Sequence, residues 1–360
     1  MSRIRVISPS QALFVGPTPS TGSHSGAVEQ LHRVQSINYD FTLNREDVNQ
    51  FGSLAAIDRV QISAPQVTLD FSYLVTNAAN EEKLGFNVDG AVSCISGLLS
   101  KASDDKNYFI LTTPIGSDAN GNASGPANGS VIGIGNGFVA SYSTEGSVGS
   151  FPTASVNIEA LHIQGYASGV SQPIPAVNPV NGQSIVGVQF TIPTAVSGNV
   201  GQSTALQAGD ITLSLGNSAL LVDATDLCIQ SYSLSFDLAR EDIECLGSKY
   251  AKSKEINFPI NVSLQVEALM GDLSTGKLNN LVCNDVGYDM SVSLKEPSCA
   301  GNGDVAVVYS IKNAKLDSQS WSSSVGPAQT VTMNWTAQIG GPEDLLNGLF
   351  ISGKTAADYQ

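Results

Sequence analysis

The sequence predicts a mainly β protein made of two duplicated domains, each a β-sandwich or β-barrel with one short α-helix. Two observations support this prediction. Residues 34–75 align without a gap with residues 229–270, at a constant offset of 195. Within this repeat, apolar and polar residues alternate with period two, the pattern of a half-buried strand. Because solenoid repeats have periods of roughly 20–50 residues, the large offset indicates two domains rather than an array.

The first strand of each copy shows the alternation over residues 36–43 and 231–238. We expect its apolar residues to face the core, namely Ile37, Tyr39, Phe41 and Leu43 in one copy and Tyr232, Leu234, Phe236 and Leu238 in the other. The next strand places Val67, Leu69, Phe71 and Tyr73 inward, matched by Val262, Leu264, Val266 and Ala268. The sequence therefore predicts two strands per copy that each have one polar face.

Few helices are expected. Apolar residues at helical spacing predict one helix at residues 91–101, and residues 274–283 occupy the matching place in the second copy. Pro342, followed by two acidic residues, predicts a short helix at the start of the C-terminal segment. Gly133, Gly135 and Gly137 do not have the spacing of a dinucleotide-binding loop, because Phe138 stands where the final glycine of that motif would be and no acidic residue follows at the required distance after a helix. We therefore interpret them as part of a turn-rich hairpin.

The repeat divides the chain into five parts: an N-terminal arm at 1–33, a first copy at 34–170, a structured connection at 171–228, a second copy at 229–341 and a C-terminal tail at 342–360. Beyond the first segment the offset falls to about 175, which aligns Asn136 with Asn313 and Tyr142 with Trp321. Arm and tail are polar or rich in proline, and we expect them to be unable to fold alone and to hold neighbouring subunits.

Charge and composition exclude several classes. The chain has 17 basic and 32 acidic residues, a net charge of −15, which argues against binding nucleic acid through phosphate contacts. No signal peptide and no apolar run of roughly 20 residues is visible, so we expect a soluble chain made in the cytoplasm, without a membrane partner. The cysteines are odd in number and lack metal-site spacing, and we interpret them as reduced apolar residues.

Enzyme signals are weak. The three histidines, His24, His32 and His162, do not form a catalytic or metal-binding pattern, so the sequence predicts no enzyme, no cofactor and no metal.

The Arg-Glu-Asp sequence occurs in both copies, in a chain where charged residues are scarce. One interpretation is a solvated surface turn. The other is that each arginine makes a directed pair with a carboxylate across a domain or ring boundary, because its planar guanidinium suits bidentate contacts. Repetition favours the second interpretation, which makes Arg45, Asp47, Arg240 and Asp242 candidate inter-domain or inter-ring contacts. Under it, loss of the Arg240 side chain is expected to block polymerisation and spare the fold.

These residues carry a family resemblance. The strand ending in Arg-x-Asp, the Gly-Ser turn, the alternating strand entered through a proline and the final strand TVTMNWTAQIG together resemble the tail tube proteins of tailed bacteriophages. The duplication is similar to siphophage major tail proteins whose subunit fuses two tube domains. The match covers residues 34–165 and 229–341.

The resemblance implies a structural protein of the virion tail, assembled in the host cytoplasm. Its trimeric, pseudo-hexameric rings would stack into the hollow tube that conducts DNA into the host. The implied partners are further copies of the chain and the tape measure, terminator and distal tail proteins. A head-to-tail connector, tail terminator or minor tube protein would form one ring instead. A carbohydrate-binding adhesin of twin β-sandwiches would expose aromatic residues on loops, whereas aromatics here lie largely in alternating strands.

In a closed ring, the polar strand faces would line the bore. Asp40 and Asp70 in the first copy, and Asp237 and Glu267 in the second, would then form an acidic lumen. This lumen would repel DNA phosphates and would let DNA pass without specific binding. The alternative is that these faces form the outer surface, since alternation does not say which side of a sheet faces the axis.

Overall fold

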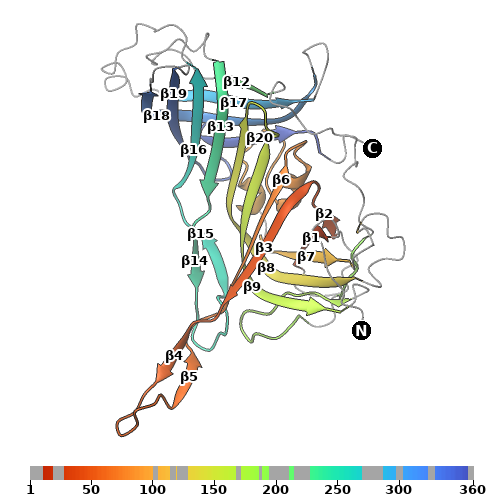
Figure 1. The fold of residues 1–360 in the computed structure, drawn as a ribbon, viewed down its shortest axis with the longest axis vertical. Coiled ribbons are helices and arrows are strands. Elements are labelled where there is room, and N and C mark those ends of the chain that lie inside the picture. The colour runs from red at the N-terminus through yellow and green to blue at the C-terminus, as the bar shows by residue number, and fades with distance from the viewer. Residues whose placement is uncertain are drawn as a thin grey trace.

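The computed structural model describes residues 11–18, 28–99, 104–113, 119, 129–167, 172–185, 189–193, 211–214, 228–269, 287–296, 303–322 and 329–355. It confirms the mainly β prediction (Figure 1). Most strands belong to one 14-stranded sheet, and every pair of strands in it is antiparallel. Both halves of the chain therefore share one sheet.

The first half contributes seven of these strands, which are β1 (Gln11–Pro17), β2 (Glu29–Gln30), β3 (Val34–Thr42), β6 (Gln66–Leu74), β7 (Lys106–Thr112), β8 (Ser130–Ser147) and β9 (Thr153–Tyr166). The second half contributes β12 (Ile211–Ser214), β13 (Cys228–Asp237), β16 (Ile260–Leu269), β17 (Tyr288–Lys295), β18 (Val305–Ser322), β19 (Thr330–Ile339) and β20 (Gly348–Gly353). The halves join where β13 pairs with the end of β8.

The two halves pair their strands in matching registers. Leu69 lies opposite Ile158, and Leu264 lies opposite Trp335. The irregularity between Val139 and Ser141 in β8 recurs between Leu316 and Ser318 in β18, so residues of β8 and β9 correspond to residues 177 positions later. Asn136 and Asn313, which this offset equates, both have positive φ, at 52° and 56°. This common geometry is what an internal duplication predicts.

The sequence alignment of Tyr142 with Trp321 was wrong by two residues. Trp321 lies opposite Val331, and the residue in the corresponding pair of the first half is Thr144, opposite Ala154. The sequence alignment matched these two residues because both are aromatic, but the strand register shows that Trp321 corresponds to Thr144.

The ranges expected to be arms each add a strand to the chain's own sheet. β1 pairs with β7 and buries Leu13, Phe14 and Val15. β20 pairs with β18 and buries Leu349 and Phe350. Continuous runs of buried hydrophobic side chains thus anchor two segments that were expected to be unable to fold alone. The short helix expected after Pro342 is wrong, because residues 342–343 form a turn that leads to β20.

Both described helices lie in the first half. α2 (Ser96–Leu99) occupies part of the helix predicted at 91–101, while α1 (Ala79–Leu84) was not predicted. α1 ends at Gly85, whose φ of 104° is the left-handed conformation that glycine adopts readily at a helix end. The helix predicted at 274–283 lies outside the described residues.

The glycines of β8 are in a strand, not in a hairpin turn. Gly135 faces the backbone of the segment that contains Pro175, and a Cβ at this position would collide with the Pro175 carbonyl group. Glycine is required here by the close approach of two backbones.

One large core contains side chains from both halves. At the junction of the halves, the Phe86 ring centroid lies 5.5 Å from that of Tyr142 and 5.8 Å from that of Phe236. A second, smaller core lies under β1, where the ring centroids of Phe109 and Phe190 are 4.2 Å apart. Edge-to-face and tilted ring pairs of this kind add to the stabilisation from burial.

Three two-stranded hairpins complete the fold, namely β4 (Arg45–Val48) with β5 (Asp58–Gln61), β10 (Gln172–Pro173) with β11 (Gln189–Phe190), and β14 (Arg240–Ile243) with β15 (Ser253–Ile256). The β4–β5 hairpin projects from one end of the long axis, whereas β14–β15 lies closer to the body (Figure 1). No helix among the described residues is long and apolar enough to cross a membrane.

Candidate functional site: the polar sheet face and the junction of the two halves

Eight neighbouring strands present one continuous polar face. In the sheet they follow the order β3, β6, β9, β8, β13, β16, β19 and β18. One row of directly opposed residues crosses five of these strands and consists of Asn38, Asp70, Asn157, Ser141 and Asp237. Because opposed residues in antiparallel strands point to the same side, these polar groups share one face. The Asn157 amide donates a hydrogen bond to the Asp70 carboxylate within this row.

The other predicted acids lie on the same face. Asp40 opposes Thr68, which in turn opposes Glu159, and Glu267 opposes Ser231. The side chains of Asp40, Asp70 and Asp237 are exposed, and that of Glu267 is partly exposed. The structure therefore brings all four sequence-predicted acids onto one surface of the sheet.

Two further acids belong to this surface and were missed from the sequence. Glu145 opposes both Thr153 and Ser233, and Glu159 opposes Thr68. Both acids stand at polar positions of alternating strands, which is the sequence signal that could have identified them. They were missed because β8 and β9 are less similar in sequence to their counterparts in the second half than β3 and β6 are.

The polar face is hollowed. A cavity of about 230 Å³ lies on it, lined mainly by Ser36, Asn38, Asp70, Ser72, Ser141, Ser143, Ser155 and Asn157. The opposite face of the same strands is covered by the core, for which Leu69, Phe71, Val156 and Leu264 are examples. The sheet thus has one side that is packed except at its free edges and one open, acidic side that bears a small hollow.

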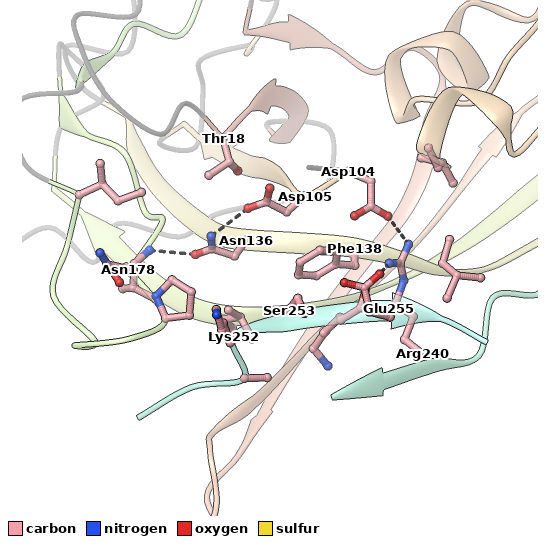
Figure 2. Close-up of a pocket in the computed structure, with 18 of the residues that line it drawn as sticks. Thr18, Asp104, Asp105, Asn136, Phe138, Asn178, Arg240, Lys252, Ser253 and Glu255 are labelled. Atoms are coloured by element: carbon pink, nitrogen blue, oxygen red, sulfur yellow. Dashed lines mark hydrogen bonds and ion pairs between the residues drawn. The ribbon is translucent and has the colours of Figure 1, made fainter. Parts of the chain in front are cut away.

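Arg240 lies buried at the junction of the halves (Figure 2). Its Nη2 donates a hydrogen bond to Asp104 at 2.6 Å, and its Nε and Nη1 donate to the backbone oxygens of Val139 and Lys254, each at 3.0 Å. Its guanidinium also lies 5.0 Å from the ring centroid of Phe138. Only 1% of the side chain is exposed. Arg240 from the second half is therefore held by Asp104, Val139 and Phe138 of the first half, together with the Lys254 backbone of its own half.

Lys254 extends this junction. Its Nζ lies 3.0 Å from Glu159 and 2.9 Å from Asp242, so it joins the β14–β15 hairpin to β9. On the other side of the junction, the Asn136 amide donates a hydrogen bond to Asp105 and accepts one from the Val177 backbone (Figure 2). Lys254, Asn136, Asp105 and Val177 border a cavity of about 650 Å³.

Arg45 and Asp47, the counterparts of Arg240 and Asp242, are exposed on the projecting hairpin. Asp47 lies 3.4 Å from Arg59, and both of these side chains are more than half exposed. Arg45 makes no hydrogen bond or ion pair with the described part of the chain. The structure thus separates the two arginines that the repeat equates.

A buried carboxyl group also links the halves. Glu81 of α1 accepts hydrogen bonds at Oε1 from the hydroxyls of Tyr73, at 2.7 Å, and Tyr142, at 2.9 Å. The Tyr142 hydroxyl lies 2.9 Å from that of Tyr309 in the second half. Burial raises the pKa of Glu81 above its ordinary value and also raises the pKa of each tyrosine. Sequence reasoning missed Glu81, which lies in a stretch without a repeat counterpart.

Among the described residues, no group of three or more His, Cys, Asp or Glu side chains is arranged to hold a metal ion. Comparison with models of known protein families and with curated proteins finds no match for this chain.

Proposed function

We propose that this chain is the subunit of a bacteriophage tail tube, in which three copies close into a pseudo-hexameric ring and the rings stack. The observation that carries the proposal is the way the sheet begins and ends. It runs without interruption through the β8–β13 junction, and in the described part of the chain it has an unpaired edge at β3 and another along the second part of β18.

Ring closure gives these edges a partner. An exposed strand edge pairs readily with another chain, and a closed barrel removes such edges altogether. The halves already associate head to tail within one chain through β8 and β13. If the same operation repeats between chains, three chains supply six equivalent units around an axis, a cyclic arrangement that is common for identical subunits.

The open polar face of the sheet supports its assignment to the bore. The apolar face carries the core and both described helices, so it is the side on which protein mass accumulates. A ring built from this sheet would turn the uncovered acidic face towards its axis. Six acidic side chains per chain, Asp40, Asp70, Glu145, Glu159, Asp237 and Glu267, lie on that face. Glu159 is paired with Lys254, and the other five would repel DNA phosphates, so that DNA passes without binding.

The proposal places the protein in the virion tail, assembled in the host cytoplasm, with tape measure, terminator and distal tail proteins as partners and with no catalytic role.

Electron microscopy of the purified chain, alone and with tail-initiating proteins, tests the proposal. Hollow tubes built from three-chain rings are expected. Isolated rings that never stack would instead identify a connector, terminator or minor tube protein. Monomers at high concentration, in the presence of tail-initiating proteins, would contradict both.

A further inference from the structure

The unpaired edges of β3 and β18 differ from the paired edge at the internal junction. β3 has β6 along one edge, and residues 315–322 of β18 have β19 along one edge. No strand among the described residues occupies the second edge of either segment. In the internal junction, the corresponding edges of β13 and β8 pair with each other.

Large aromatic side chains are exposed beside these free edges. Tyr39 and Phe41 of β3 are 45% and 55% exposed, and Trp321 of β18 is 59% exposed. The residues of β13 that match Tyr39 and Phe41 are Leu234 and Phe236, which are 0% and 2% exposed. The apolar side chains of the same alternating pattern are therefore buried in β13, which has a partner strand on this edge, and exposed in β3, which has none.

The internal junction supplies a register for the free edges. In it, Leu234 opposes Thr144 and Phe236 opposes Tyr142. The repeat equates β13 with β3 at an offset of 195, a relation that the matching β3–β6 and β13–β16 registers share. The β8 and β18 registers are related by an offset of 177. The repeat counterpart of Leu234 is Tyr39, and the counterpart of Thr144 is Trp321. If the free edges pair in the same register as the internal junction, Tyr39 lies opposite Trp321.

We propose, resting on the tube function above, that residues 38–42 of one copy pair antiparallel with residues 318–322 of the next copy, with Tyr39 opposite Trp321. The same register places Asn38 opposite Ser322, Asp40 opposite Ser320, Phe41 opposite Gln319 and Thr42 opposite Ser318. The transferred register depends only on backbone pairing, yet it brings together two aromatic residues that are both exposed in the single chain. Opposed aromatic pairs stabilise antiparallel strands.

The two faces of this seam are chemically consistent. Trp321 opposes Val331 on the packed side of the sheet, so the Tyr39–Trp321 pair would extend the core and not the bore. Asn38, Asp40 and Ser320 fall on the other side, where they continue the polar face. The second copy of the chain is thus an occupant that matches both sides of the free edge.

The seam is confined to the strands. Lys315 occupies the position in β18 that corresponds to Phe138 in β8, since it opposes Thr336 as Phe138 opposes Glu159. Arg240 lies over the Phe138 ring, and a lysine offers Arg45 no such surface. The β4–β5 hairpin therefore does not repeat the docking of β14–β15.

Disulfide crosslinking tests the register. Two cysteine pairs, Asn38→Cys with Ser322→Cys and Tyr39→Cys with Trp321→Cys, are placed in chains whose Cys228, Cys245, Cys283 and Cys299 are replaced by serine. Adjacent cross-strand pairs alternate between two geometries, so testing both covers the one that accepts a disulfide. The first pair leaves both aromatics intact. Mild oxidation of the assembled protein is expected to give covalent dimers and trimers.

The matched control is Asn38→Cys with Ser320→Cys, which keeps both cysteines on one face but two residues out of register, about 7–8 Å apart by the diagonal spacing of strands and too far for a disulfide. Tubes that form without crosslinks at either predicted pair would overturn the seam and leave the tube function standing. Crosslinked rings that never stack would support the seam and contradict the tube. Monomers at all concentrations would overturn both.

A second measurement addresses the aromatic pair. Tyr39→Ser and Trp321→Ser should each raise the concentration needed for assembly by on the order of tenfold or more, because buried aromatic residues dominate many interfaces. Val305→Ser removes an exposed apolar side chain of β18 away from the seam and should leave that concentration unchanged. Equal effects of all three changes would contradict the assigned contact.

Discussion

Arg240 and Arg45 occupy the same position of the repeat, but their surroundings give them different roles. Arg240 is buried with Asp104 and two backbone oxygens, whereas Arg45 is exposed on the projecting hairpin. Removal of one partner from a buried ion pair leaves the other charge uncompensated in a medium of low dielectric constant. The consequence of mutation therefore depends on the half in which the arginine lies.

We predict that Arg240→Ala lowers the free energy of unfolding by about 3–5 kcal/mol, while Arg45→Ala leaves it unchanged. Chemical denaturation of the unassembled chain, followed by circular dichroism, measures both. This predicted loss of stability differs from the expectation from sequence alone, that Arg240→Ala spares the fold. Equal stability of the two variants would show that the Arg240–Asp104 contact is not formed in solution.

Glu81 gives a prediction about pH. Its folded-state pKa is raised, above the ordinary value of 4.5, by burial. Its neutral form is therefore the one that the fold favours, and this contribution to stability is present at low pH and lost as pH rises through the folded-state pKa. The thermal unfolding midpoint should fall from mildly acidic to alkaline pH, and Glu81→Gln should reduce that slope. A Glu81→Gln protein with the full wild-type slope would assign the pH dependence to other groups.

At the scale of the strand, β3 shows what alternation does and does not predict. The pattern in residues 36–43 identified a strand, and β3 spans Val34–Thr42. Its apolar residues were expected to face a core, but Tyr39, Phe41 and Leu43 are exposed in the single chain. The same expectation was correct for β13, because β8 and Phe86 cover it. Alternation with period two predicts which residues share a face of the strand. Whether that face is buried also depends on a neighbouring strand or side chain that the alternation does not identify.

Hydrogen exchange should show the same difference. In the unassembled chain, amides of residues 34–42 are expected to exchange faster than those of residues 228–237, because one edge of β3 lacks a partner. On assembly, exchange in 34–42 should slow and exchange in 228–237 should change little. Mass spectrometry of the two peptides measures this, and unchanged exchange in 34–42 after assembly would contradict edge pairing.

At the scale of the whole molecule, the repeat predicts which strands of the two halves correspond. The offset of 195 equates β3 and β6 with β13 and β16, and the strand registers of these two pairs agree with it. The strands β1 and β20 lay in ranges expected to be arm and tail. A short apolar run in polar surroundings is a weak sequence signal for a strand, because its strand conformation depends on pairing with the edge of a sheet. The acidic face was predicted from four residues, and only the register added Glu145 and Glu159.

The charge of that face gives a prediction for the assembled tube. Lysine at Asp40, Asp70, Asp237 and Glu267 would place twelve positive side chains in each ring of three chains, where the native surface repels phosphate. Tubes of this variant should retain DNA at low salt and release it at high salt, as measured by filter binding and by protection of the bound DNA from nuclease. Normal tubes with these side chains on the outer surface would reject the bore assignment and leave the tube proposal intact.

The covalent link between the halves has a consequence for assembly entropy. A ring of six separate units must bring six bodies together, whereas three fused chains bring together only three, so fewer units lose translational and rotational freedom. The β8–β13 contact forms at the high effective concentration set by the tether and does not dissociate on dilution. Every second junction of such a ring would be insensitive to protein concentration. Assembly would then be controlled entirely at the remaining three, where a single substitution at Tyr39 acts three times per ring.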